Sequence, residues 1–370
     1  TQDDRWGRSY ESYSEDPALV KVYAREMVYG LQGVPGTPEF VDSRHVLATA
    51  KHFLGDGGTG DGDDQGNTKV SEEELRDIHA PGYVGAIEAG VQTVMASFSS
   101  WNGAKMHGNP YLLTDVLRGQ MSFDGFVIGD WNGHGQVPGC TNATCAASVN
   151  AGLDMFMVID EWKELYHNTL EQVREGEISQ ERLDQAVRRV LRVKILAGVF
   201  EKGRPSERAR GLEGVIGSPE HRAVARQAVR ESLVLLKNAG GVLPLQPGQQ
   251  VLVAGDGAEN MGKQTGGWTI SWQGTGNEKS DFPDGSTILD GLKEAVAGIG
   301  GSVEYSLEGA YTVKPDVAVV VFGENPYAEY QGDLPTLEFE PGNKQTLGLL
   351  NSLKNDGIPV VSVFITGRPL

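Results

Sequence analysis

An acidic residue beside a large aromatic residue ends a short apolar run between residues 126 and 131. The run reads Phe-Val-Ile-Gly and is followed by Asp130 and Trp131. Such a run predicts a strand that is buried on both faces of a parallel sheet, and α/β proteins place their chemistry at the carboxyl ends of these strands. A carboxylate can act on the anomeric carbon of a sugar while an indole stacks on the pyranose ring. A helix N-cap followed by a packing tryptophan is the alternative interpretation.

A second group of acids and aromatics follows another apolar run, at residues 316–323. The loop over residues 324–333 carries Glu329 between two tyrosines. Asp130 and Glu329 are 199 residues apart in the sequence, in different predicted domains, and a cleft at a domain interface could bring them together. Two carboxylates that face one bond are the equipment of glycoside hydrolysis. The alternative is a mobile acidic loop at the surface.

The charge of the chain restricts the class of partner. Its 370 residues include 32 basic and 50 acidic residues, which gives a formal net charge of −18. Phosphate binding needs a basic face, so this balance argues against nucleic acid, and it also disfavours anionic membranes. No stretch approaches the roughly 18 apolar residues of a membrane helix. The charge suits a neutral substrate.

Two cysteines, Cys140 and Cys145, enclose a short segment. Two cysteines alone cannot make a zinc site, and with His134 as a third ligand no fourth is evident. We expect a small loop disulfide, which would fit an oxidising compartment, and two free thiols are the alternative. The segment between the cysteines contains a glycosylation sequon at Asn142, which has meaning only in a eukaryotic secretory protein.

Apolar runs alternate with amphipathic segments along the first half of the chain. We predict strands over 45–53, 91–100, 126–131 and 152–158, and helices over 71–89, 110–120, 161–175 and 179–197. Four strands that end in polar residues predict parallel βα units and part of a (β/α)8 barrel, with an open doubly wound sheet as the alternative. No Gly-x-Gly-x-x-Gly follows a strand at the required place, so dinucleotide binding has no support.

A Gly- and Arg-rich segment separates this half from a second alternating region. We predict a barrel domain over 1–203, a linker over 204–217 and a sandwich domain over 218–370. The second domain begins with a helix over 218–238, with Pro219 in its first turn. Strands over 251–254, 316–323 and 359–365 and helices over 287–297 and 343–354 then predict a three-layer αβα sandwich. The chain stops just after a predicted strand, and we expect an internal fragment of a longer protein.

Six segments in a fixed order carry a resemblance to a known family. They are residues 5–16, 51–57, 129–131, 231–238, 266–274 and 324–333. On these segments the chain resembles the β-glucosidases and exo-β-glucanases of glycoside hydrolase family 3, closest to the exo-1,3/1,4-β-glucanase branch. The resemblance covers nearly the whole chain. It implies an α/β protein in which a partial (β/α)8 TIM barrel precedes a partial αβα sandwich.

The resemblance assigns two catalytic roles. Asp130 is implied to be the nucleophile of a retaining mechanism that forms a covalent glycosyl-enzyme. Glu329 is implied to be the general acid/base, because the family motif places the acid after a Pro-Tyr-Ala step, and Glu324 is its competitor in the same loop. Retaining enzymes hold the two carboxyl groups roughly 5–5.5 Å apart. The resemblance implies no metal and no organic cofactor.

Substrate-binding residues are implied in the same way. Arg8, Lys51 and His52 resemble the residues that hold the hydroxyls of the nonreducing-end glucose, and charged donors make the stronger hydrogen bonds. Trp131 and Trp272 resemble an aromatic clamp on the next sugar.

Some positions of the sequence depart from the family pattern. Trp268 lies beside the clamp motif, and we expect it in the core. Phe98 is also predicted to bind substrate, and it stands near the nucleophile where relatives often carry Tyr. The loss of the Tyr hydroxyl would change the orientation of Asp130 without abolishing the chemistry. Gln65 stands where some plant relatives carry Glu. An early-barrel Asp that grips the sugar has no counterpart here, so we do not expect the first part to close a barrel.

These inferences predict a secreted or periplasmic exo-acting β-glucosidase or β-glucanase that releases glucose from β-1,3 or β-1,4 glucans. One alternative is a β-N-acetylhexosaminidase of the same family, whose acid/base is a His in the loop after Lys-His-Phe. Residues 57–68 contain Asp61, Asp63 and Asp64 but no His, which counts against it. Another is a noncatalytic glucan-binding protein on this scaffold, and the presence of both Asp130 and Glu329 disfavours it.

Overall fold

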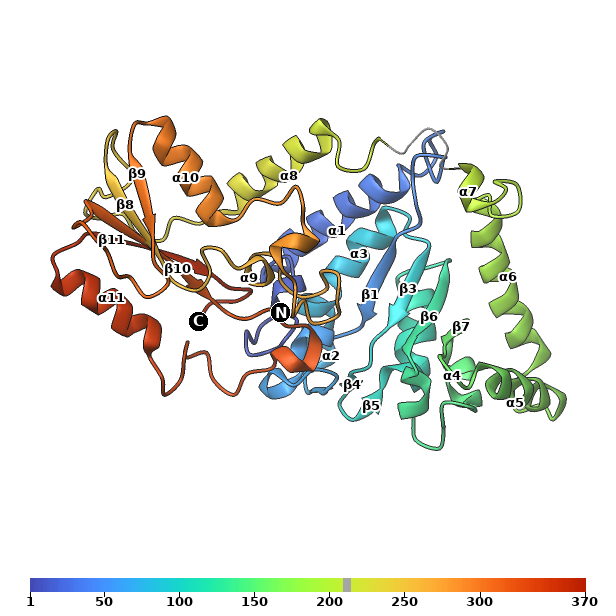
Figure 1. Ribbon diagram of the computed structural model, residues 1–370. Coiled ribbons are helices and arrows are strands. Elements are labelled where there is room, and N and C mark those ends of the chain that lie inside the picture. Colours follow the sequence, from blue (N-terminus) through green and yellow to red (C-terminus); the bar gives the residue numbers. More distant parts are fainter. Residues whose placement is uncertain (209–213) are drawn as a thin grey trace. The chain divides into compact units, whose positions relative to one another are not determined.

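The computed structural model describes residues 1–208 and 214–370, and the chain divides into two compact units (Figure 1). Unit 1 is Thr1–Arg210 and unit 2 is Gly211–Leu370. The predicted linker over 204–217 contains one short helix, α7 (Pro205–Arg208), while its residues 209–213 lie outside the described residues. Of the helices in the described ranges, none combines the length and the apolar character that a membrane crossing needs.

Unit 1 is built on a parallel sheet whose strands follow one another in chain order. These strands are β1 (Thr49–Phe53), β3 (Thr93–Ala96), β6 (Phe126–Trp131) and β7 (Met155–Met157). The predicted α/β class with parallel strands is therefore confirmed. The sheet is open, and the described residues do not close a barrel. Because parallel strands end at the same edge of a sheet, the segments after β1, β3 and β6 lie together.

Helices of unit 1 lie between and after these strands. They are α1 (Pro17–Gln32), α2 (Glu72–Glu74), α3 (Pro81–Glu88), α4 (Ala146–Ala151), α5 (Trp162–Arg174) and α6 (Gln180–Leu196), with π-helical turns η4 (Leu75–His79) and η6 (Tyr111–Gln120). The helix predicted over 71–89 is broken because Pro81 lacks an N–H and starts a new helix at its first turn. Ser179 caps α6, since its side chain accepts a hydrogen bond from the backbone of Arg182.

A second, three-stranded sheet in unit 1 was not predicted. It comprises β2 (Asn67–Thr68), β4 (Ser100–Trp101) and β5 (Ala104–Lys105). Strands of two residues are too short to produce a recognisable alternation of apolar and polar side chains. Short 3-10 turns complete the unit: η1 (Ser9–Glu11), η2 (Asp56–Gly58), η3 (Gly60–Gly62), η5 (Met106–Gly108) and η7 (Gly133–Gln136).

A buried carboxylate fastens α6 and η6 to the sheet beside β6. The side chain of Asp154 is fully buried and pairs with Arg118, with Arg182 at 2.7 Å and with Arg189 at 3.2 Å. It also accepts a hydrogen bond from the backbone N–H of Val127 at 2.9 Å. Three guanidinium groups compensate the cost of burying one carboxylate, and this fixes the strand that carries Asp130.

Unit 2 is a three-layer αβα sandwich, as predicted. Its parallel sheet has the order β11 (Val360–Ile365), β10 (Val317–Gly323), β8 (Gln250–Ala254) and β9 (Ser302–Tyr305). Alternate residues of β8 and β10 pack on opposite faces: Val251 and Val253 share a core with α10 (Ile288–Gly298), and Leu252 and Ala254 share one with α11 (Gln345–Asn355). Figure 1 shows these two helices on either side of the sheet. Two short elements, α9 (Met261–Thr265) and η8 (Lys279–Asp281), follow β8.

The helix predicted over 218–238 is shorter than expected. Helix α8 (Pro219–Ser232) starts where it was predicted, with Pro219 in the first turn and Ser218 as its cap, but it ends at Ser232 and Leu233 is extended. None of its residues is buried, so only local propensity supports the helix. Helix propensity alone gives little stability when no apolar face is packed on a core. The β-branched Val234 lowers the helix propensity of the segment after Ser232 further.

Candidate active site

The proposed nucleophile occupies the end of a strand. Asp130 and Trp131 are the last two residues of β6, and the Asp130 side chain is 15% exposed. Its Oδ1 accepts a hydrogen bond from the backbone N–H of Trp131 at 2.7 Å. Trp131 is 60% exposed. The alternative of an N-cap with a packing tryptophan is therefore wrong, because the carboxylate lies in a strand and the indole is open to solvent.

His52 joins this carboxylate to a second, buried one. Its Nε2 lies 3.5 Å from Oδ2 of Asp130, and its Nδ1 lies 2.8 Å from Oδ2 of Asp56. The other Asp56 oxygen accepts hydrogen bonds from the hydroxyls of Ser97 at 2.9 Å and Ser99 at 3.2 Å. Burial acts to raise the pKa of Asp56, but the charge and hydrogen bond of His52, with Arg8 and Ser97, lower it overall. Asp56 thus stays ionised and orients the imidazole.

A second histidine contacts the backbone of the same aspartate. Nε2 of His107 accepts a hydrogen bond from the backbone N–H of Asp130 at 2.9 Å, and His107 is 1% exposed. Burial lowers the pKa of His107 to about 4, so its ring is neutral at pH 7. Sequence analysis missed His107, because a histidine in a 3-10 turn after a two-residue strand carries no periodic signal. It also assigned no role to Asp56.

The three predicted hydroxyl-binding residues lie on one cavity of unit 1. Arg8, Lys51 and His52 are among the residues that line this cavity, whose volume is about 440 Å³. Lys51 is exposed, whereas Arg8 is 6% exposed and pairs with Glu11 through Nε at 2.8 Å and Nη2 at 2.7 Å. Glu11 fixes the direction of the guanidinium, which burial would otherwise disfavour.

Asp130, Trp131 and Phe98, all in the described part of unit 1, are not among the residues that line this cavity. His52 links the cavity to Asp130. Phe98 is half-buried and its ring lies 6.0 Å from that of His107, measured between centroids. It is thus close to the support of Asp130, and its contact with substrate remains a prediction.

In unit 2, the two glutamates after β10 have different surroundings. Oε2 of Glu324 accepts hydrogen bonds from the Tyr327 hydroxyl at 3.0 Å, the Thr366 hydroxyl at 2.8 Å and the backbone N–H of Gly367 at 3.2 Å. Its Oε1 pairs with Nε of Arg368 at 3.3 Å, and that guanidinium also stacks over Tyr327. Glu324 thus joins the end of β10 to the residues that follow β11.

Glu329 lies in a different setting. It begins the turn η9 (Glu329–Gly332), is partly exposed and has a φ of +53°. The preceding residue, Ala328, is held by Gln273: its N–H donates to Oε1 at 2.7 Å, and its carbonyl accepts from Nε2 at 3.1 Å. Gln273 belongs to the family segment 266–274. The structure therefore brings together the two segments of unit 2 in which catalytic and clamp residues were predicted.

The aromatic residues of this region are open to solvent. Trp272 is 43% exposed and packs edge to face on Tyr330, with 5.8 Å between the ring centroids. Trp268 was predicted to lie in the core, but it is 48% exposed, and its φ is +61°. Ile270 has the same φ and is 71% exposed. The core prediction failed because the Gly-rich segment turns tightly and directs these side chains outward.

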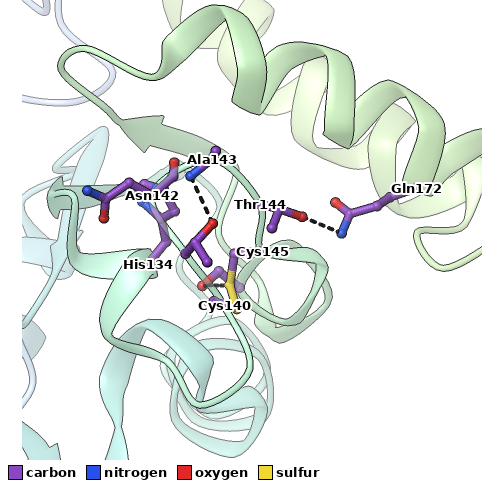
Figure 2. Close-up of a disulfide and its surroundings, with 9 residues drawn as sticks. His134, Cys140, Asn142, Ala143, Thr144, Cys145 and Gln172 are labelled. Atoms are coloured by element: carbon purple, nitrogen blue, oxygen red, sulfur yellow. Dashed lines mark hydrogen bonds between the residues drawn. A yellow bond between two sulfur atoms is a disulfide. The ribbon is translucent and has the colours of Figure 1, made fainter.

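The segment that follows η7 is closed by a disulfide between Cys140 and Cys145, as predicted (Figure 2). Ring nitrogen Nε2 of His134 lies 2.8 Å from the carbonyl of Asn142, and Gln172 of α5 donates a hydrogen bond to the Thr144 hydroxyl at 3.0 Å. The disulfide loop is thus held by contacts to His134 before it and to Gln172 after it. Within the described residues, no three His, Cys, Asp or Glu side chains are grouped to hold a metal ion.

Comparison with family models divides the chain in two. The model described as "Glycosyl hydrolase family 3 N terminal domain" matches residues 1–193, and the one described as "Glycosyl hydrolase family 3 C-terminal domain" matches residues 233–370. A lysosomal beta glucosidase of Dictyostelium discoideum is 32% identical, over 98% of this chain and 47% of that protein. A periplasmic beta-glucosidase of Salmonella typhimurium is 29% identical, over 100% of this chain and 52% of that protein.

Solved structures are similar over the whole chain. An exo-1,3/1,4-beta-glucanase from a Pseudoalteromonas species is 53% identical with a TM-score of 0.96, and the match covers 100% of this chain and 46% of that one. A mutant beta-glucosidase from Listeria innocua in complex with laminaribiose is 30% identical with a TM-score of 0.84, over 100% of this chain and 51% of that one. The chain spans about half the length of the curated relatives it matches.

Proposed function

The chain belongs to glycosyl hydrolase family 3, as its six sequence segments predicted, and we propose that it acts in the hydrolysis of terminal β-linked glucose from β-glucans or β-glucosides. The names of its relatives support this substrate class. The observation that carries the proposal is the support of one strand-end carboxylate, Asp130, by His52 at its carboxylate and by His107 at its backbone. The preference for β-1,3 or β-1,4 linkages rests on the resemblance to exo-1,3/1,4-β-glucanases.

In the proposed mechanism, Asp130 attacks the anomeric carbon and forms a covalent glycosyl-enzyme. Glu329 protonates the departing oxygen and then activates the water that releases the sugar, so that the anomeric configuration is retained. Glu324 is a poor candidate for this role, because Tyr327, Thr366 and Arg368 already occupy its oxygens. The pairing of Asp130 and Glu329 at one bond is part of the proposal.

Other residues of the candidate site are proposed to bind the substrate. We propose that Arg8, Lys51 and His52 bind the hydroxyls of the terminal glucose, since all three line the cavity that His52 links to Asp130. The exposed indoles of Trp131 and Trp272 are available to stack on a sugar ring.

The proposed compartment is the periplasm or the exterior of the cell. A disulfide persists in an oxidising compartment, and the Salmonella relative is named a periplasmic enzyme.

Covalent trapping tests the assignment of the nucleophile. A 2-deoxy-2-fluoro aryl β-glucoside should add one fluoroglucosyl group to the protein, detectable by intact mass, and peptide mapping should place it on Asp130. Asp130→Asn should abolish the adduct and lower turnover of aryl β-glucosides by about 10⁴-fold or more. The matched control is Asp124→Asn, because Asp124 is a carboxylate of the same unit that is 73% exposed. Trapping that survives in Asp130→Asn would refute the assignment.

Comparison of substrates separates the remaining alternatives. Turnover of an aryl N-acetyl-β-glucosaminide in preference to the aryl β-glucoside would favour the hexosaminidase. Binding of laminarin without release of glucose would favour a noncatalytic glucan-binding protein.

A further inference from the structure

A buried imidazole is enclosed by the segment that carries the proposed nucleophile. His107 accepts the backbone N–H of Asp130 on one side. A Cβ atom added at Gly133 would lie 2.4 Å from Cε1 of the ring, and one added at Gly129 would lie 3.4 Å from its Cδ2 and Nε2. The chain around Asp130 therefore leaves room for this ring by having glycine at residue 133, whereas a Cβ atom at residue 129 would make an ordinary van der Waals contact with it.

The hydrogen bond to Asp130 determines where the ring carries its proton. Because Nε2 of His107 accepts an N–H, the neutral ring has its proton on Nδ1. The backbone of Ser97 also interacts with the ring and acts to raise its pKa. Burial lowers the pKa of His107 to about 4, so this arrangement persists at neutral pH. A protonated ring would direct a donor at the Asp130 N–H and break the contact.

Ser97 connects this histidine to the one that contacts the carboxylate. The Ser97 hydroxyl donates to Asp56, and Asp56 binds Nδ1 of His52. Nε2 of His52 then lies 3.5 Å from Oδ2 of Asp130. A continuous series of contacts thus starts at the backbone N–H of Asp130, passes through His107, and returns to its carboxylate.

We infer that His107 is a positioning residue, which holds the backbone of Asp130 by accepting its N–H and so fixes the carboxylate for attack on the anomeric carbon. The inference rests on the proposed role of Asp130 as nucleophile. Such a backbone contact fixes the position of the carboxylate before it attacks the anomeric carbon. A displacement of about 1 Å of a reacting group can lower a rate by about 10²-fold.

Two conservative variants separate the two hydrogen bonds of the ring. In His107→Gln the amide oxygen can take the place of Nε2 and accept the Asp130 N–H, but the donor on the Ser97 side is lost. In His107→Asn the amide nitrogen can take the place of Nδ1 and donate toward Ser97, but the acceptor is lost. The rate of covalent labelling by the fluoroglucoside should fall by less than about tenfold in His107→Gln and by about 10²-fold in His107→Asn.

A merely structural role would give a different pattern. His134→Gln is the matched control, since His134 is also 1% exposed but its ring lies against the Asn142 carbonyl. It should lower the melting temperature without changing the labelling rate. The KM for an aryl β-glucoside should stay within about twofold in both His107 variants, because His107 is assigned no contact with substrate. Equal loss of labelling in the two His107 variants, or a loss in His134→Gln as well, would overturn the inference.

Failure of the inference and failure of the proposed function can be told apart. An unlabelled wild-type protein would refute the role of Asp130 in catalysis. Amide hydrogen exchange of residues 126–133 then tests the contact without turnover. Faster exchange in His107→Asn than in His107→Gln would support the backbone anchor, and equal exchange in both would overturn it.

Discussion

The two carboxylates proposed to act on one bond are held in contrasting ways within their units. Asp130 is the next-to-last residue of β6, which pairs with β3 on one edge and with β7 on the other, and the register with β7 shifts between Ile128 and Trp131. Glu329 lies in a loop with a φ of +53°, and the adjoining segment carries Trp268 and Ile270 at +61°. A non-glycine residue in the left-handed region of φ costs about 1–3 kcal/mol of backbone strain. The proposed nucleophile therefore lies in a strand and outside the left-handed region of φ, whereas the proposed acid/base lies within that region.

The difference agrees with what each group would do. A nucleophile attacks one carbon from one direction, and a strand supported by side chains on both sides limits its movement. An acid/base gives up a proton and takes one back in successive steps, with different partners. Gln273 anchors the residue before Glu329, and Arg368 donates a hydrogen bond to the Gly332 carbonyl after it at 2.6 Å. Glu329 itself is partly exposed between these two anchors, which suits that task. We therefore expect substitutions in the two regions to differ in their dependence on the leaving group.

Replacement of the acid/base should have the largest of these effects. Glu329→Gln should lower turnover of β-glucans by about 10²–10⁴-fold, since general acid catalysis contributes this much. A dinitrophenyl β-glucoside needs no protonation of its leaving group, so its first step should persist and the glycosyl-enzyme should accumulate. The measurement is pre-steady-state release of dinitrophenol, followed by intact mass.

Glu324→Gln is the comparison for this experiment. It should destabilise unit 2 by about 3–5 kcal/mol in urea denaturation, because it leaves the buried Arg368 without its carboxylate. The fractional loss of activity in Glu324→Gln should be the same for substrates with good and poor leaving groups. Dependence on the leaving group in Glu324→Gln but not in Glu329→Gln would exchange the two roles.

An intermediate effect is expected where the loop is anchored. Gln273→Ala removes both hydrogen bonds to Ala328 and should lower kcat for substrates with poor leaving groups by about tenfold, with little loss on the dinitrophenyl glucoside. Gln264→Ala is the matched control, because Gln264 also joins two backbone groups, at Gly257 and Ile288. The control should lose similar stability with unchanged kcat. Similar kcat losses in both variants would show that the anchor acts only through stability.

The two units should also differ in their response to acid. Burial lowers the pKa values of His79 and His107 in unit 1 to about 4, below the ordinary value of 6.5. The unfolded chain therefore takes up protons first, so their contribution to stability is complete above pH 6.5 and is lost toward pH 4. The loss is at most about 1.4 kcal/mol per pH unit for each histidine.

Unit 2 provides the internal comparison, because its one histidine, His221, is exposed. Hydrogen exchange of peptides from each unit, measured between pH 7 and pH 4.5, should show greater opening in unit 1. In His107→Gln this difference should be smaller. Equal opening of both units would contradict the assignment of neutral buried histidines to unit 1.

Regular elements with a strong pattern could be predicted closely from the sequence. The strand over 126–131 was placed at its observed residues, because its apolar run is bounded by a clear polar stop. The end of α8 was misplaced by six residues, since no packing supports the helix there. Exposure of Trp268 could not be predicted, because direction in a tight Gly-rich turn depends on φ values that no local pattern reveals.

The candidate site also contains residues that could be predicted from the sequence and residues that could not. Residues inside family motifs, such as Asp130 and His52, were located from the sequence, and the structure places these two within 3.5 Å. The contact from His107 is different, because it joins residues 23 positions apart through a backbone amide. A hydrogen bond to the backbone requires no particular side chain at the other end, so the sequence carries no paired signal for it.

The space that glycine leaves at residue 133 also bears on how this region can vary over evolution or in a mutant library. Any other residue there would place a Cβ atom 2.4 Å from the imidazole ring of His107. A single replacement at residue 133 therefore requires a smaller partner at residue 107, and a smaller residue at 107 alone leaves a void. We therefore expect a replacement at residue 133 to need a second change at residue 107, and randomisation of residue 133 alone should return few folded variants.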